Sequence, residues 1–169
     1  MPPHRQGPPP GTIPVTVPGD AVLVRTPSMV VLAGAIMAFR NGFEFTLLTL
    51  FDTRRQQAPV DFALQPEDRH RETWLTIRYS DGRSRAADLN VNTPEDLPEG
   101  PHLTMQDGVM HSTEGWGAIR WWVSPLPPPG PVELAIHLNG NTRPTGVGRL
   151  DGSALARAAA LAEVSWPES

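Results

Sequence analysis

The sequence predicts an all-β protein, an antiparallel β-sandwich with one short C-terminal α-helix. Segments of alternating apolar and polar residues recur along the chain, with turn residues between them about every 8–12 positions. Three of these turns contain Asn-Gly or Asp-Gly, the dipeptides that favour tight hairpins between antiparallel strands. Helical periodicity is confined to one stretch near the C-terminus. These signals favour an immunoglobulin-like sandwich, and a jelly roll or an open barrel would use the same local signals.

The first 18 residues differ from the rest in composition. They contain seven of the 20 prolines of the chain and no hydrophobic periodicity. Proline-rich segments of this type adopt extended conformations and need no packed core. We therefore expect residues 1–18 to form a disordered arm. Residues 19–169 then make a single β-sandwich domain, which is a typical length for one domain.

Strands and hairpins account for most of the remaining chain. A first strand is expected at Ala21–Arg25, a short β-rich run. The expected hairpins are Ser28–Phe39 with Phe43–Phe51 around Asn41–Gly42, Thr73–Tyr79 with Arg83–Val91 around Asp81–Gly82, and His102–Gln106 with Val109–Thr113 around Asp107–Gly108. Near the C-terminus, Asp151 can act as an N-cap, which predicts a helix from there to about Val164, before Pro167.

The segment Gly115–Leu138 is the most distinctive part of the sequence because it holds three tryptophans and five prolines. Ala118–Val123 alternates as a strand, the prolines make a stiff turn, and Val132–Leu138 alternates as a second strand. Neighbouring residues of a strand point to opposite faces. Trp121 and Trp122 therefore cannot both face the same layer.

The pattern predicts a binding surface around Trp122. If Trp121 faces the core, Trp122 lies with Arg120 on the other face, and an exposed indole beside an arginine is typical of a protein interface. The alternative is that every indole of the segment is buried, because tryptophan is highly buried on average. The predicted binding residues are Arg120, Trp122, Pro127, Pro128 and Pro129.

Two phrases of the sequence resemble a family of uncharacterised actinobacterial proteins. The phrase W-x-S-P-L-P-P-P-G-P-x-E occupies Trp122–Glu133, and L-D-G-x-A-L-x-x-A-A-x-x-A-x-x-x-W-P occupies Leu150–Pro167. Arg25–Thr26–Pro27 also resembles this family. The resemblance covers both ends of the globular part. That family has no assigned activity, so the resemblance implies no functional residue.

Composition excludes several classes of partner. The formal net charge of -4 and the pI near 5.7 disfavour nucleic acid, which attracts basic surfaces. The chain has no cysteine, so disulfides and thiolate metal sites are absent. Its longest apolar run, Met29–Phe39, is shorter than the ~20 residues that span a membrane. The N-terminus also lacks the apolar region of a signal peptide. We therefore expect a cytoplasmic protein with no membrane partner.

Catalytic motifs are missing from the sequence. It contains no G-x-S-x-G elbow, no phosphate-binding loop and no H-E-x-x-H zinc motif. If Asp107–Gly108 is a hairpin turn, His102 and His111 lie on one face, and His137 could join them from another strand. Such a cluster could hold a metal. We expect no metal and no cofactor, because no spacing fixes a carboxylate ligand beside these histidines.

The function favoured by the sequence is non-catalytic binding of another protein, or self-assembly. The alternative is a small hydrolase or metal-dependent enzyme that uses His102, His111 and His137. A third possibility is carbohydrate binding through an exposed Trp116 or Trp122, since indole rings stack on sugars.

Overall fold

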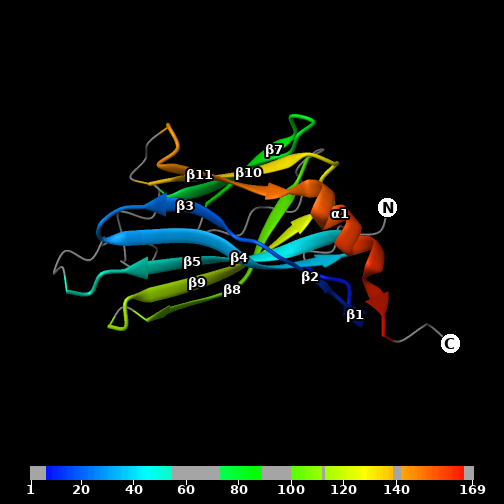
Figure 1. Cartoon of the computed structure of the whole chain (residues 1–169), viewed down its shortest axis with the longest axis horizontal. Helices are drawn as coiled ribbons and strands as arrows, with labels where there is room; N and C mark the ends of the chain where they lie inside the picture. The colour runs from blue at the N-terminus through cyan, green and yellow to red at the C-terminus, as the bar shows by residue number, and fades with distance from the viewer. Residues whose placement is uncertain (1–6, 55–72, 89–99, 112, 139–141, 166–169) are drawn as a thin grey trace.

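The computed structural model of the chain describes residues 7–54, 73–88, 100–111, 113–138 and 142–165. Within these residues it contains three antiparallel β-sheets and one α-helix (Figure 1). The predicted all-β fold with antiparallel layers and one short C-terminal helix is confirmed. The immunoglobulin-like form of the sandwich stays a prediction.

The larger sheet has six strands. Its path is β2-β4-β5-β9-β8, and β3 pairs with β4 on the same edge as β2. Its strands are β2 (Val15–Val17), β3 (Ala21–Arg25), β4 (Met29–Phe39), β5 (Gly42–Phe51), β8 (His102–His111) and β9 (Trp116–Ser124).

The second sheet has four strands in the order β11-β10-β6-β7. These are β6 (Trp74–Arg78), β7 (Ser84–Asp88), β10 (Pro131–His137) and β11 (Gly146–Asp151). A two-stranded ladder joins β1 (Thr12–Ile13) to β12 (Glu163–Val164), and the helix α1 spans Gly152–Leu161.

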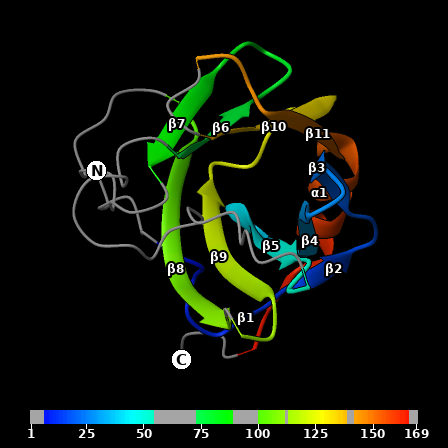
Figure 2. The same cartoon turned by 90° about the vertical axis from the view of Figure 1, so that its left-hand side faces the viewer.

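The core lies between the two larger sheets (Figure 2). Both sheets contribute the inward residues of their alternating strands, as expected from the period of two. On the side where β11 meets β3, Gly148 allows close approach, because a Cβ there would lie 2.8 Å from Cδ2 of Leu23 and 3.0 Å from Cβ of Ala21. The largest fully buried side chains include Trp121, Tyr79, Phe43, Phe45, Leu47, Leu75, Ile77, Leu134, Ile136 and Leu155.

Two of the three predicted hairpins are confirmed. Phe39 pairs with Gly42, so β4 and β5 form the predicted hairpin with Arg40–Asn41 as its turn, and Gly42 is the first residue of β5. Arg78 pairs with Ser84 around Asp81–Gly82, and Gly82 has a φ of +90°, a conformation that favours glycine.

The hairpin predicted at Asp107–Gly108 is wrong. Both residues lie inside β8, a ten-residue strand that pairs with β9 along its length. The register shifts between Met105 and Asp107, so the strand continues through an irregularity instead of turning. Pairing with β9 gives the backbone of β8 more inter-strand hydrogen bonds than a two-residue hairpin would. These hydrogen bonds override the local turn preference of Asp107–Gly108.

The expectation that Gly115–Leu138 forms a hairpin is also wrong. The two strands of this segment lie in different sheets, because β9 pairs with β5 and β8 while β10 pairs with β6 and β11. The proline-rich connection therefore crosses from one layer to the other. Tyr79 Oη donates a hydrogen bond to the carbonyl of Pro125 (2.6 Å), and Ser80 Oγ donates to that of Pro129 (2.8 Å), so the β6–β7 turn fixes the crossover.

The N-terminal arm is not disordered where the structure describes it. Thr12–Ile13 pairs with β12, and Val15–Val17 pairs with the edge of β4, where Val17 is buried in the core. The β-branched run from Ile13 to Val17 explains these strands, since such residues favour extended backbone. Residues 1–6 of the predicted arm lie outside the described residues.

The C-terminal helix begins as predicted. Oδ1 of Asp151 accepts hydrogen bonds from the backbone N–H groups of Ser153 (2.9 Å) and Ala154 (3.2 Å). The helix ends at Leu161, three residues earlier than predicted, because Glu163–Val164 leaves it to pair with β1.

Candidate functional site

The outer face of the six-stranded sheet, which points away from the core, carries three aligned rows of side chains. The strand register sets them, since cross-strand partners lie side by side on one face. The first row is Val30, Leu50, Trp116 and His111; the middle row is Leu32, Leu48, Ala118 and Val109; the third row is Gly34, Thr46, Arg120 and Asp107.

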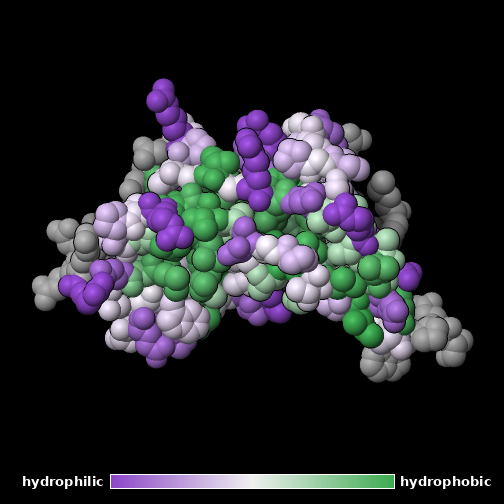
Figure 3. All heavy atoms as spheres, in the orientation of Figure 1, coloured by the Kyte–Doolittle hydropathy of each residue, from purple (hydrophilic) through white to green (hydrophobic). Residues whose placement is uncertain are grey.

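The first and middle rows form an apolar surface that water reaches. Leu50 is 41% exposed and Val109 is 47% exposed, and Val22 of β3, the pairing partner of Leu32, continues the surface with 39% exposure. Figure 3 shows hydrophobic side chains gathered over the left-hand parts of β3, β4 and β5. We call this surface the outer stripe; it consists of Val22, Val30, Leu32, Leu48, Leu50, Val109, Trp116 and Ala118.

Trp122 lies on the same face as the outer stripe but is not part of it. The prediction of an exposed Trp122 is wrong, because its side chain is 0% exposed. Its ring meets Phe39 edge-on, and a Cβ on Gly42 would lie 2.6 Å from its Cζ2. The alternative that this indole is buried is therefore the correct one for Trp122.

The N-terminal segment runs from one edge of the six-stranded sheet to the other at the end that holds Trp122. A Cβ on Gly7 would lie 3.1 Å from Oε1 of Gln106, so the segment starts beside β8. It then pairs with β12 and reaches the opposite edge of the sheet at Val15–Val17 (Figure 2). It leaves the outer stripe open at the other end.

Arg120 lies at the boundary between the covered and open ends. Its guanidinium pairs with the carboxylate of Asp107 across the β8–β9 ladder (2.9 Å) and is 43% exposed. Its exposure agrees with the prediction of an accessible arginine. An exposed ion pair contributes little stability, so its position at the rim of an apolar surface is its more informative property.

A buried carboxylate lies beside this ion pair. Glu44, the pairing partner of Trp122, is only 3% exposed. Burial raises its pKa above 4.5, Arg120 opposes this effect, and Asp107 reinforces it. Glu44 therefore forms a polar cluster with Arg120 and Asp107 of the third row.

Trp116 is the tryptophan nearest to solvent on this face. The His111 ring stacks on the Trp116 ring, with the ring centroids 4.4 Å apart. Nε1 of Trp116 donates a hydrogen bond to Oε2 of Glu114 (3.1 Å). The imidazole occupies one face of the indole. A sugar ring could stack only on the opposite face of the Trp116 indole.

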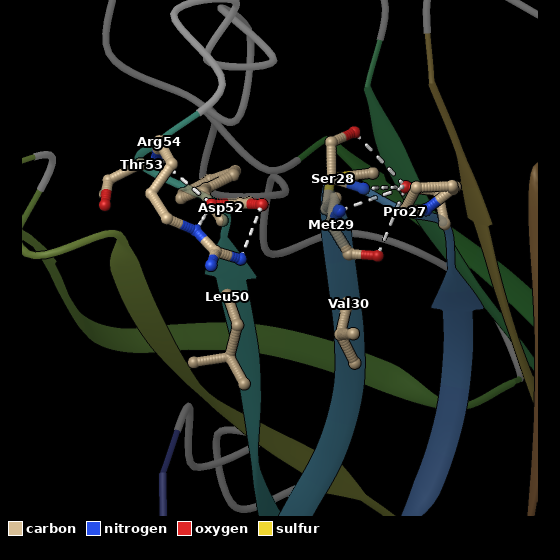
Figure 4. Close-up of a pocket in the computed structure, with 10 residues that line it drawn as sticks. Pro27, Ser28, Met29, Val30, Leu50, Asp52, Thr53 and Arg54 are labelled. Carbon is tan, nitrogen blue, oxygen red and sulfur yellow. Dashed lines mark hydrogen bonds and ion pairs between the residues drawn. The ribbon is translucent and has the colours of Figure 1, made fainter.

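A shallow hollow of about 400 Å³ lies at the end of the outer stripe, where β4 begins and β5 ends (Figure 4). Val30 and Leu50 form its apolar side. Asp52 and Arg54 form its polar side, with Arg54 Nε 2.9 Å from Oδ1 of Asp52 and Nη2 3.1 Å from Oδ2. The Asp52 carboxylate raises the pKa of Arg54 by hydrogen bonding.

The three histidines of the enzyme hypothesis do not converge. His102 and His111 lie at opposite ends of β8, about 30 Å apart along an extended strand. His137 belongs to the other sheet, where it stacks on Trp74 at 4.8 Å. Within the described part of the chain, no group of three or more histidines and carboxylates could hold a metal ion.

The predicted binding prolines lie apart from the outer stripe, in the crossover between the sheets. Pro127 is buried, Pro128 is half-buried, and Pro129 is exposed with its carbonyl bound to Ser80. The structure therefore does not bring these prolines together with Arg120 into one surface.

No helix among the described residues has the length and apolar character needed to cross a membrane. Neither a protein-family model, nor a curated protein, nor a solved structure matches this chain. The resemblance to uncharacterised actinobacterial proteins stays a prediction.

Proposed function

We propose that this chain is a non-catalytic protein-binding module and that its contact surface is the outer stripe. One observation carries the proposal: apolar side chains on four adjacent strands and on Val22 of β3 form one continuous surface that water reaches. Soluble proteins rarely leave such surfaces open unless a partner covers them.

The surroundings of the outer stripe support this role. Arg120 and Asp107 border it on one side, and Asp52 and Arg54 border it on the other. An apolar centre with a polar rim is the usual arrangement of a protein interface. The rim charges are already paired within the chain, so they can approach a partner without leaving an uncompensated charge.

The proposed setting is the cytoplasm. The 169 residues include no cysteine, and disulfides are the usual reinforcement of small domains outside the cell. The expected partner is another protein or a second copy, and the acidic pI argues against nucleic acid.

A site-specific photo-cross-linking experiment tests the proposal. A benzophenone amino acid replaces Ala118 in the outer stripe, and in a matched control it replaces Ala160, an exposed alanine of α1. We expect covalent adducts with protein, either a different chain or a second copy, from position 118 and none from position 160. Adducts from neither position, or equal adducts from both, would contradict the proposal.

A further inference from the structure

We infer that the occupant of the outer stripe is a second copy of this chain, packed face to face about a twofold axis along the middle row. The inference rests on the proposed function and names its partner. In a twofold interface the same surface of both copies must fit itself. The three rows of the outer face meet this condition.

The shapes of the rows are complementary under this operation. A twofold axis along the middle row places the first row of one copy over the third row of the other. On β5, Leu50 then faces the smaller Thr46 of the second copy. The large side chain on this strand therefore meets a small one. An axis along the strands would instead place Leu50 and the other large side chains on the first row of the partner.

The charges are complementary under the same operation. On β8, Asp107 of one copy faces His111 of the other, and on β9, Arg120 faces Trp116. An arginine over an indole is a favourable cation–π pair, and each pair occurs twice because the interface is symmetric. The polar residues of the third row thus have partners in the first row.

The size of the outer face suits a dimer of ordinary stability. Five strands from β3 to β8 at their usual spacing span about 19 Å, and the three rows span about 13 Å. With a rim of roughly one side chain on each side, the footprint is about 650 Å², within the range of standard interfaces of roughly 600–1,000 Å² per partner. Strands of facing sheets would run within about 30° of each other, as in other sandwiches.

Single-cysteine variants of the purified 169-residue chain test the axis, since its sequence has no thiol. Facing sheets lie about 10 Å apart, so a bismaleimide with a spacer of about 8 Å can join thiols across the interface. We expect Ala118→Cys and Val109→Cys each to cross-link to itself, because both lie on the axis. Leu50→Cys and Thr46→Cys should cross-link mainly when the two variants are mixed. Ala160→Cys on α1 is the control and should stay unlinked.

Two results would overturn the inference. One is the absence of linked dimers from both Ala118→Cys and Val109→Cys when circular dichroism shows that the variants are folded. The other is efficient self-linking of Leu50→Cys without Thr46→Cys, which would place the axis along the strands. Photo-adducts of position 118 with a different protein, together with unlinked Ala118→Cys, would reject the second copy and leave the proposed function standing.

Discussion

Trp122 packs edge-on against Phe39, with ring centroids 5.4 Å apart and ring planes at 77°. This is the favoured geometry of an aromatic pair, and both rings lie on the outer face of the six-stranded sheet. The sheet therefore has two apolar faces at this end. One faces the core, and on the other Trp122 and Phe39 are both buried.

The replacement Trp122→Ala should destabilise the fold by about 3–5 kcal/mol, because it empties a buried site of indole size. The partly exposed Trp74 of β6 lies outside the outer stripe and is the matched control, so Trp74→Ala should lower the free energy of unfolding by clearly less than Trp122→Ala. Urea denaturation measures both values. Equal losses for the two variants would contradict the difference in burial.

Removal of residues 1–18 should destabilise the protein although these residues look like a dispensable arm. The deletion takes away the ladder of β2 on β4 and the buried Val17 side chain, whose burial alone contributes about 1.5–3 kcal/mol. A fall in the melting temperature is expected. If the truncated chain has the same melting temperature as the 169-residue chain, the segment is not part of the fold.

The replacement Glu44→Gln should stabilise the protein at neutral pH. Burial raises the pKa of Glu44 in the folded state, so the folded chain holds this proton more tightly than the unfolded chain, where the pKa is near 4.5. The favourable contribution of Glu44 is complete below that value and is lost as the pH rises through the folded pKa. The variant should therefore gain free energy of unfolding at pH 7 and little at pH 4. A loss at pH 7 would mean that Glu44 is stabilised there as a carboxylate by Arg120.

The replacement Asp151→Ala should cost about 1 kcal/mol, because two N-terminal N–H groups of α1 lose their acceptor. Asp151→Asn keeps a side-chain oxygen at the cap and should recover most of that stability. Thermal unfolding followed by circular dichroism compares the variants. If Asp151→Asn is as unstable as Asp151→Ala, the cap is not the source of the effect.

Local sequence signals predicted much of the fold. Gly82 has the positive φ that glycine favours in the turn between β6 and β7, and Asp151 specifies a helix start through its side-chain oxygen. The hairpin between β4 and β5 also forms where Asn41–Gly42 predicted it, with Arg40–Asn41 as the turn residues. Asp107–Gly108 has the same local preference as the other turns. Its outcome differs because the neighbouring strand β9 is long enough to pair with both sides of the dipeptide.

The sheet assignment of each strand was not predictable in this way. Alternation shows which residues of a strand share a face, but it does not name the neighbouring strand. The two strands around the proline-rich connection therefore looked like a hairpin, and they lie in different sheets. Their separation depends on distant contacts, such as the hydrogen bond from Tyr79 to the carbonyl of Pro125.

The candidate site was predicted in part. Alternation correctly placed Arg120 and Trp122 on the face opposite Trp121. It could not show that Trp122 is buried at one end of this face while Leu50 and Val109 are exposed at the other, because that depends on segments distant in sequence. The apolar run Met29–Phe39 carried a signal for the outer stripe, since its residues are apolar on both faces of the strand.

The molar mass in solution tests the central claim most directly. Light scattering after size exclusion should give the wild-type chain twice its monomer mass of 18.4 kDa. Leu50→Arg, in the outer stripe, should give the monomer mass with unchanged circular dichroism. Leu161→Arg, an equal change of charge at a 68% exposed leucine of α1, should leave the dimer intact. A wild-type monomer, or a dimer that persists in Leu50→Arg, would contradict the claim that the outer stripe joins two copies.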